Sequence, residues 1–289
     1  MNRATTREIN GDDRLGAGDR LRYLWRNALA NLCGARRPAF RAFARWSPPQ
    51  SVVASARGNP TSPGRLLAEA FIVHELPGRL PPGPIKVLEI GCGAGRTRRQ
   101  LVRAGYNGRY TGLDVEDRFD RAADIPEFEW SFLEADAHTI ETGPRYDLVL
   151  SNSALEHIAD DRELVDRLRA CLRPGGVQLH IVPSGTALLA YLWHGWRQYP
   201  AGALGRRFDP ATTEVFGLGG MASLLVHLTW ITLPEQIFRL ALRTRARRAY
   251  GACVRLAFGL DRIAPFGAPM YAVIEHAPAG AAAATGGAA

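Results

Sequence analysis

Short apolar runs recur through the middle of this chain and predict buried strands. A mainly apolar run is typical of a strand that is covered on both faces, as in a parallel sheet. Helices have to cover the two faces of such a sheet, so the pattern predicts an α/β fold. The runs lie at residues 85–90, 110–114, 132–137, 146–152 and 177–182, with a last one at residues 270–276.

The N-terminal part of the chain has a helical period instead. From Leu21 to Leu32 the apolar residues recur three and four positions apart, with arginines between them, which predicts an amphipathic helix. Residues 38–46 mix Phe and Trp with Arg in the same way and predict a second one. Such helices suit either an anionic membrane surface, where aromatic side chains lie at headgroup level, or a lid that packs on the domain with its arginines in solvent.

A long segment precedes the last predicted strand. It begins with a cluster of aromatic and basic side chains: Tyr191, Trp193, His194, Trp196, Arg197 and Tyr199. An uncharged stretch between Glu214 and Glu235 follows, and then a basic segment with apolar residues at 237–248. The uncharged stretch is long enough to span a bilayer, but its glycines and hydroxyl side chains favour a buried or interfacial helix. An aromatic, basic segment suits a ligand with an apolar part and a phosphate group.

These patterns predict five segments in the chain of 289 residues. They are a basic helical N-terminal extension (1–60), an α/β core (61–183), a helical aromatic and basic insertion (184–265), the last strand of the core (266–276) and an Ala/Gly-rich tail (277–289). The tail lacks charge and aromatic residues, so we expect it to be disordered. Ser62 and Pro63 predict the first helix of the core, as its cap and its first residue.

The first apolar run of the core leads directly into three glycines at alternate positions, in the sequence Glu89-Ile90-Gly91-Cys92-Gly93-Ala94-Gly95. Glycine lets the chain turn sharply and lets a ligand approach the backbone. The helix expected from about Arg96 would direct its first amides into the same turn. A dinucleotide fingerprint needs a small residue where Arg96 stands, so the pattern disfavours nicotinamide and flavin cofactors. Taken alone, the glycines could also form a plain strand-to-helix turn.

Further motifs follow the loop in order. Asp114 ends the second strand, Asp136 follows the third, Ser151-Asn152 ends the fourth, and Leu172-Arg173-Pro174-Gly175-Gly176 precedes the fifth. In this order they resemble the motifs of class I S-adenosylmethionine-dependent methyltransferases of the small-molecule branch, over about residues 63–183 and the last strand. The resemblance implies a Rossmann-like sheet, mostly parallel with an antiparallel last strand and helices on both faces. It also implies S-adenosylmethionine as the cofactor.

The resemblance further implies which residues bind this cofactor. They are Glu89, Gly91, Cys92, Gly93 and Gly95 in the loop, Asp114 and Val115 at the ribose, Asp136 and Ala137 near the adenine, and Ser151 at the edge of the fourth strand. A carboxylate such as Asp114 offers two acceptor oxygens to the two ribose hydroxyl groups. Alternatively, Asp114 is a solvated acid at a strand end, and Asp136 stands in a stretch that is rich in carboxylates anyway.

His157 follows the polar edge of the fourth strand, where the methyl group should emerge. Imidazole groups titrate near pH 6.5, which suits a base for an acceptor hydroxyl; alternatively His157 packs at a helix start. The segment from Ser153 to His157 also resembles that of ubiquinone-pathway O-methyltransferases, in which two glutamates and a histidine bind a divalent metal. Glu156 and His157 are present, but Ser153 replaces the first glutamate. One missing anionic ligand leaves a poor site for a hard cation, so we predict no metal.

Charge is distributed unevenly within the net +8 of the chain. Residues 1–84 carry 13 Arg and six acidic residues (net +7), residues 85–183 carry 13 basic and 17 acidic residues (net −4), and residues 184–289 carry ten Arg and five acidic residues (net +5). The predicted core is therefore acidic between basic flanks. The strong preference for Arg over the single Lys is also expected from a biased base composition, which weakens it as evidence for nucleic-acid binding.

The sequence therefore favours methyl transfer, in the form of O-methylation, to a small-molecule or lipid-linked acceptor. Four widely spaced cysteines indicate a reducing cytoplasm, and the basic flanks add peripheral contact with the anionic inner face of the membrane. An RNA methyltransferase is the alternative enzyme, but no Asn-Pro-Pro-Tyr-type motif follows the fourth strand and no RNA-binding module is visible. An inactive cofactor-binding scaffold is the alternative from another class.

Overall fold

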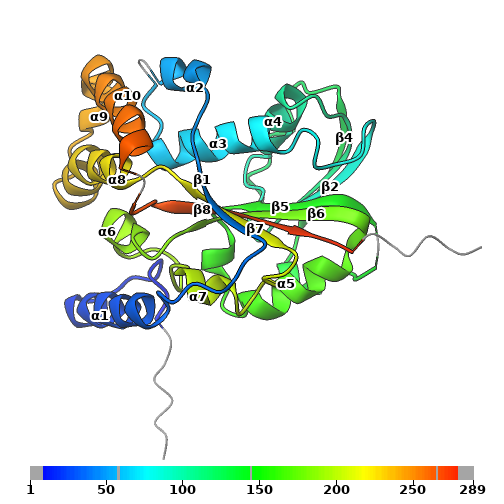
Figure 1. Ribbon diagram of the computed structural model, residues 1–289, viewed down its shortest axis with the longest axis horizontal. Helices are drawn as coiled ribbons and strands as arrows, with labels where there is room; N and C mark the ends of the chain where they lie inside the picture. The colour runs from blue at the N-terminus through cyan, green and yellow to red at the C-terminus, as the bar shows by residue number, and fades with distance from the viewer. Residues whose placement is uncertain (1–8, 57–58, 144, 265, 279–289) are drawn as a thin grey trace, which may run out of the picture.

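The computed structural model of the protein describes residues 9–56, 59–143, 145–264 and 266–278. Within these residues, eight strands form one sheet in the order β1-β7-β8-β6-β5-β2-β3-β4 (Figure 1). The strands are β1 (Ala42–Trp46), β2 (Ile85–Ile90), β3 (Gly108–Asp114), β4 (Phe128–Glu134), β5 (Tyr146–Asn152), β6 (Leu172–Pro183), β7 (Thr213–Leu218) and β8 (Met270–His276).

One strand runs against the others. β8 is antiparallel to both of its neighbours, β6 and β7, whereas the remaining pairs of neighbouring strands are parallel. The predicted fold class, a mostly parallel sheet with an antiparallel last strand, is thus confirmed.

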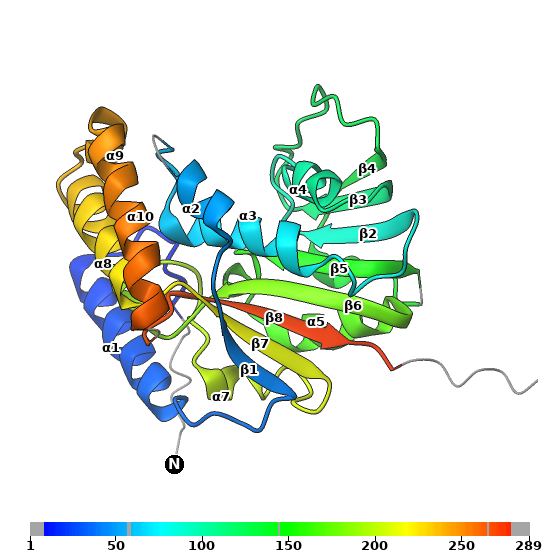
Figure 2. The same cartoon turned by 45° about the horizontal axis from the view of Figure 1, so that its top comes forward.

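Helices cover both faces of the sheet. They are α1 (Ala17–Cys33), α2 (Gln50–Ser55), α3 (Pro63–Glu75), α4 (Thr97–Arg103), α5 (Asp161–Ala170), α6 (Ala187–Tyr191), α7 (Ala201–Leu204), α8 (Met221–His227), α9 (Leu242–Arg245) and α10 (Arg247–Ile263), with the π-helix η3 (Leu228–Ile237) and the short 3₁₀ turns η1 (Ala137–Thr139) and η2 (Leu155–His157). The helices α3 and α4 lie on one face, and α5 and α7 lie on the other (Figures 1 and 2).

Each face has its own buried core. Phe71 of α3 packs in a cluster that includes Val87 of β2, while Leu168 of α5 packs in a second cluster that includes Leu88. Val87 and Leu88 are adjacent in the sequence, and side chains along a strand point to alternate faces. This is why a mainly apolar run correctly predicted a strand that is buried on both faces.

Two segments differ from the sequence predictions. The helix predicted over residues 38–46 is wrong, because Ala42–Trp46 forms the edge strand β1, parallel to β7. Phe43 packs on Tyr271 and Trp46 on Phe71, which belong to the two different buried clusters. A short mixture of Arg and aromatic residues fits a helical and an extended period equally well, and the neighbouring strand decides between them.

The insertion is also not wholly helical. Its uncharged stretch divides into the strand β7, the helix α8 and most of η3, so the core is completed by β7 together with β8. No helix within the described ranges is both long and apolar enough to cross a membrane. The start of α3 follows the prediction, since Ser62 Oγ accepts a hydrogen bond from the Arg65 amide and Pro63 is the first helical residue. The tail predicted to be disordered lies outside the described residues from residue 279 onward.

Candidate active site

A cavity of about 1320 Å³ lies at the carboxyl ends of the central strands. Its floor and walls come from the loops that follow β2, β3, β4 and β5, from α3, and from two outlying segments around Asp12 and His194. β2 lies between β3 and β5 in the sheet. The connections that leave β2 and β5 run in opposite directions, to β3 and to β6. Open α/β sheets bind their ligands at such a point.

The glycine loop forms one wall of the cavity. Gly91 has a φ of 65°, and a Cβ atom there would lie 2.5 Å from the Cβ atom of Ala154. Gly93 has a φ of 49°, and a Cβ atom there would meet open space, so a ligand can approach its backbone directly. The Gly93 amide donates a hydrogen bond to Asp114 Oδ2 over 2.8 Å. This bond holds the end of β3 against the loop.

Glu89 lies beneath the loop and is buried. Its two carboxyl oxygens accept hydrogen bonds from Thr97 Oγ1 and from the Tyr110 hydroxyl group. Burial raises the pKa of Glu89 to about 7, although both hydrogen bonds oppose this shift. Burial also raises the pKa of the Cys92 thiol, so this group stays protonated and acts as a small side chain in the loop.

Most of the predicted cofactor residues are in the cavity wall. Those that line it are Glu89, Gly91, Cys92, Gly93, Asp114, Val115, Asp136 and Ala137. Gly95 is at the turn behind the loop, where a Cβ atom would lie 2.4 Å from the ring of Phe119. Ser151 is buried within the sheet, with its hydroxyl group 2.8 Å from His180 Nδ1. Asn152 and Ser153 line the cavity in its place. Asn152 is the last residue of β5, and Ser153 follows the strand.

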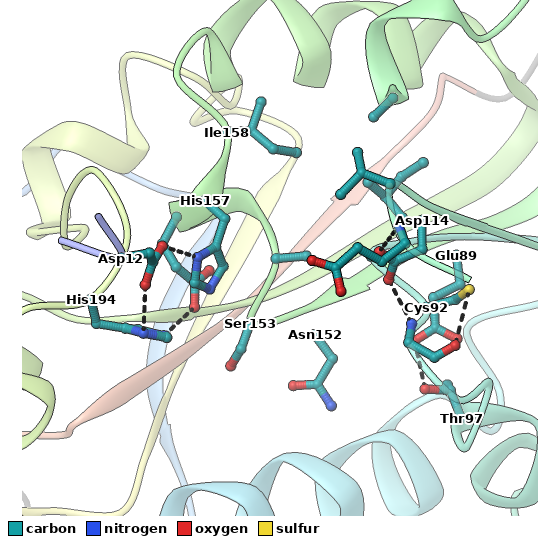
Figure 3. Close-up of a pocket in the computed structure, with 18 of the residues that line it drawn as sticks. Asp12, Glu89, Cys92, Thr97, Asp114, Asn152, Ser153, His157, Ile158 and His194 are labelled. Carbon is teal, nitrogen blue, oxygen red and sulfur yellow. Dashed lines mark hydrogen bonds and ion pairs between the residues drawn. The ribbon is translucent and has the colours of Figure 1, made fainter. Parts of the chain in front are cut away.

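The opposite wall carries a cluster of two histidines and two carboxylates. His157 Nδ1 lies 2.7 Å from Asp12 Oδ2, and His194 Nδ1 lies 3.5 Å from the other oxygen of Asp12. His194 Nε2 lies 3.7 Å from Glu156 Oε1. Figure 3 shows Asp12, His157 and His194 on one side of the cavity and the glycine-loop residues on the other, with Ser153 and Asn152 between them.

The cluster has a defined charge. Burial alone would lower the pKa of His194, but hydrogen bonds to Asp12 and Glu156 raise it to about 9. Both ring nitrogens of His194 face carboxylate oxygens, so both carry protons at neutral pH. Burial would raise the pKa of Asp12, but hydrogen bonds from His157 and His194 outweigh it and hold the pKa well below its ordinary value. Asp12 is therefore an anion between two imidazole rings.

Asp12 is the residue of this site that the sequence did not indicate. It is held in place because the Gly11 amide donates to the carbonyl oxygen of Gly195 (2.7 Å), and the Gly195 amide donates to Asp12 Oδ2 (3.2 Å). The next helix, α1, packs on the same loop through the Tyr23 hydroxyl group, which donates to the carbonyl oxygen of His194. The N-terminal extension and the insertion therefore close one side of the cavity together, as a lid.

The aromatic cluster predicted from the insertion divides into two parts. Tyr191, Trp193, His194 and Trp196 line the cavity. Arg197 and Tyr199 instead contact the buried carboxylate of Asp161, at the start of α5. The residues of this cluster lie one or two positions apart in an irregular segment, where sequence spacing does not show which side chains point the same way. The sequence therefore could not distinguish the residues that line the cavity from those that contact Asp161.

Three of these residues are close enough to share a cation. Within the described part of the chain, Asp12, His157 and His194 each offer a ligand atom, and these atoms lie within 4.8 Å of one another. Asp12 and His194 could thus supply ligand atoms in place of the glutamate that Ser153 replaces. However, a doubly protonated imidazole is not a metal ligand, and the pKa of His194 favours the proton. The absence of a metal stays a prediction.

The comparison with protein families agrees with this geometry. Residues 88–178, from the glycine loop to β6, match the model of a family described as a methyltransferase domain. The central part of this chain is therefore similar to the S-adenosylmethionine-dependent methyltransferases. The cofactor of this family is S-adenosylmethionine. The wall formed by Gly93 and Asp114 fits it, because that wall offers an open backbone and a strand-end carboxylate.

Curated relatives match the central part of this chain. A ubiquinone biosynthesis O-methyltransferase of Methylobacterium sp. (strain 4-46) is 36% identical over 110 residues, and a trans-aconitate 2-methyltransferase of Azoarcus sp. (strain BH72) is 31% identical over 93 residues. These matches cover 35% and 32% of this chain, and 43% and 36% of the relatives. The chain thus spans less than half the length of either relative.

Solved structures are similar over a longer part of the chain but at lower identity. A putative methyltransferase of Haloferax volcanii, in complex with its Trm112 activator, is 18% identical, with a TM-score of 0.49, over 78% of this chain and 97% of that one. A putative sarcosine dimethylglycine methyltransferase of Galdieria sulphuraria is 13% identical, also with a TM-score of 0.49, over 74% of this chain and 86% of that one.

Proposed function

We propose that this protein transfers the methyl group of S-adenosylmethionine to an oxygen atom of a small-molecule or lipid-linked acceptor. The cofactor supplies a methyl group that is already activated on a sulfonium, so the protein mainly has to orient the acceptor and remove its proton. The residues assigned to the donor side are the glycine loop and Asp114. The residues assigned to the acceptor side are those of the opposite wall.

The contact between Asp12 and His157 is the observation that carries the proposal. Asp12 accepts a hydrogen bond from Nδ1 of His157, which fixes the neutral tautomer with its lone pair on Nε2. Within the described residues, Nε2 has no hydrogen-bond partner, and His157 lines the cavity. The acceptor oxygen would take the methyl group and give its proton to Nε2. His157 is then the catalytic base, and Asp12 is a positioning residue.

The acceptor wall supports a molecule with both apolar and polar parts. Tyr191, Trp193, Trp196 and Met270 provide apolar and aromatic surface, while Arg65 provides a cation. Quinols, polyketide-like phenols and glycolipid sugars have this combination. The relatives that act on ubiquinone precursors and on trans-aconitate support an oxygen acceptor on a small molecule.

The test is turnover of labelled S-adenosylmethionine with a panel of these three acceptor classes, after binding of S-adenosylhomocysteine has been measured. His157→Ala should lower turnover about 10²-fold or more, and Asp12→Asn about tenfold or more, with cofactor binding unchanged. Asp12→Glu should restore part of the activity.

Asp13→Asn is the matched control, since Asp13 is an exposed neighbour outside the cavity wall, and its turnover should equal that of the wild type. EDTA should change little. Unaltered turnover in His157→Ala would return this residue to a structural role, and inhibition by EDTA that magnesium reverses would show a metal site instead. Incorporation of the label into RNA, or cofactor binding without turnover on the whole panel, would contradict the proposed function.

A further inference from the structure

The helix α1 turns its apolar face to solvent. Leu21, Trp25, Leu29 and Leu32 follow one another at helical spacing, and their exposed fractions are 70%, 69%, 43% and 74%. The side that packs on the protein presents Tyr23 and Asn27 instead. An amphipathic helix normally buries its apolar stripe, so this stripe indicates a surface that is covered by something else.

A second exposed apolar stripe lies on α10. Leu256, Leu260 and Ile263 are 65%, 47% and 83% exposed, again at helical spacing, and Phe266 beyond the helix is 63% exposed. The other side of α10 carries the buried residues Tyr250, Val254 and Phe258. Two helices that are far apart in the sequence thus both expose an apolar stripe, although α10 buries a second one.

These helices gather at one end of the molecule, together with α8 and α9. They lie at the left of both ribbon views, away from β3, β4 and α4 (Figures 1 and 2). We call α1, α8, η3, α9 and α10 together the helical end. Its elements contain nine arginines and three acidic residues. Two of these acids pair with arginines (Asp19 with Arg22, Glu235 with Arg243), and Asp261 is buried.

We infer that the helical end binds peripherally to an anionic lipid bilayer. Exposed Trp and Leu side chains between arginines match the depth profile of such a surface, with the apolar groups below the headgroups and the cations among them. A second copy of the chain is the less suitable occupant, because a symmetric contact would place the same arginines opposite one another. The described helices do not span a bilayer, so the contact is interfacial.

The acceptor wall of the cavity adjoins this surface. Gln236 of η3 lines the cavity, and the next two residues, Ile237 and Phe238, are 48% and 65% exposed. Arg20 of α1 stacks on Trp193 of the same wall. Resting on the function proposed above, a bilayer at the helical end would bring a lipid-linked acceptor close to His157. The bilayer contact itself does not depend on methyl transfer.

The experiment is sedimentation of the full chain with vesicles, scored together with the rise in melting temperature caused by S-adenosylhomocysteine. The protein should bind vesicles that contain phosphatidylglycerol, bind pure phosphatidylcholine weakly, and dissociate at high salt. Leu21→Ser/Trp25→Ser/Leu32→Ser should weaken binding about tenfold or more. Arg245→Gln/Arg247→Gln/Arg248→Gln should weaken it roughly 10- to 100-fold on anionic vesicles.

Matched controls come from the other end of the molecule. Leu133→Ser, in β4, removes a side chain that is 46% exposed, and Arg99→Gln/Arg103→Gln removes two exposed arginines of α4. Both controls should bind vesicles like the wild type, and all variants should keep the response to S-adenosylhomocysteine. No binding to anionic vesicles at low salt, equal binding to neutral ones, or a dimer that the triple α1 variant converts to monomers would each overturn the inference.

Discussion

The hydrogen bond from the Gly93 amide to Asp114 joins the glycine loop to the predicted ribose-binding acid. We expect S-adenosylhomocysteine to raise the melting temperature, since it binds only the native state. Asp114→Ala should weaken its binding by about 1–3 kcal/mol through lost charge-assisted hydrogen bonds. Gly93→Val should abolish it, because a β-branched residue is strained at a φ of 49°. Titration calorimetry measures both effects.

Asp117→Ala is the control for this prediction. Asp117 lies three residues after Asp114, in the loop that follows β3, but it pairs with Arg121 on the surface. The affinity of this variant for S-adenosylhomocysteine should match that of the wild type. Stabilisation by NAD in place of S-adenosylhomocysteine would show that the cavity serves a different cofactor.

His194 makes the stability of the folded protein depend on pH. Its pKa is about 9 in the folded protein, against an ordinary value of 6.5, so the native state binds more protons between these two values. The stability contributed by His194 is therefore complete below pH 6.5 and is lost as the pH rises through about 9. Thermal unfolding of His194→Gln should show its largest loss of melting temperature below pH 6.5 and a small one above about pH 9.

The exposed His74, on α3, is the control for this effect. His74→Gln should lower the melting temperature much less than His194→Gln does below pH 6.5, because the His74 side chain is exposed. A loss of melting temperature in His194→Gln that is the same at every pH would show that His194 does not carry the proton that its two carboxylate neighbours indicate.

At the scale of elements, the N-terminal extension has two separate roles. Its first part brings Asp12 to the cavity, and its last part is the edge strand β1. Removal of residues 1–15 leaves α1 and β1 in place, so cofactor binding and fold should persist while turnover falls as in Asp12→Asn. Removal of residues 1–46 should lower the melting temperature and promote aggregation, because it leaves β7 as an unpaired edge and uncovers Phe71.

Circular dichroism, calorimetry with S-adenosylhomocysteine and turnover on one acceptor distinguish the two truncations. If the protein without residues 1–46 had the same melting temperature as the protein without residues 1–15, β1 would not be part of the cooperative fold. Full turnover without residues 1–15 would show that the site does not need Asp12.

At the scale of the whole molecule, the two ends differ in chemistry. Residues 85–183, which carry a net negative charge, form the strands β2 to β6 of the sheet and the glycine-loop wall of the cavity. The helices α1, α8, α9 and α10 lie at the helical end (Figure 2). The cavity lies between these two parts, with the glycine-loop wall on one side and the lid on the other. Two segments that are far apart in the sequence meet in this lid, since Gly11 and Asp12 contact Gly195.

Local sequence was sufficient to predict the strands β2 to β6 and β8, and the glycine loop and Asp114 in the cavity wall. The strands are short apolar runs, and the loop from Gly91 to Gly95 and the acid Asp114 follow their strands directly, so each of these features depends on neighbours in the sequence. The neighbouring residues Ser62 and Pro63 were also sufficient to predict where α3 begins. Where a segment was short and its composition ambiguous, as at residues 38–46, local pattern failed because pairing with β7 decided the outcome.

The tertiary structure alone decided the acceptor side. Asp12 meets His157 and His194 across separations of 145 and 182 residues, and no local pattern marks a lone acid in a polar N-terminal segment. The same holds for Ser151, which pairs with His180 inside the sheet and not with the cavity. Nor does helical period indicate which face of α1 is buried, because the apolar stripe that would normally pack inward here points to solvent. These features depend on which surfaces the folded chain brings together, and only long-range packing specifies them.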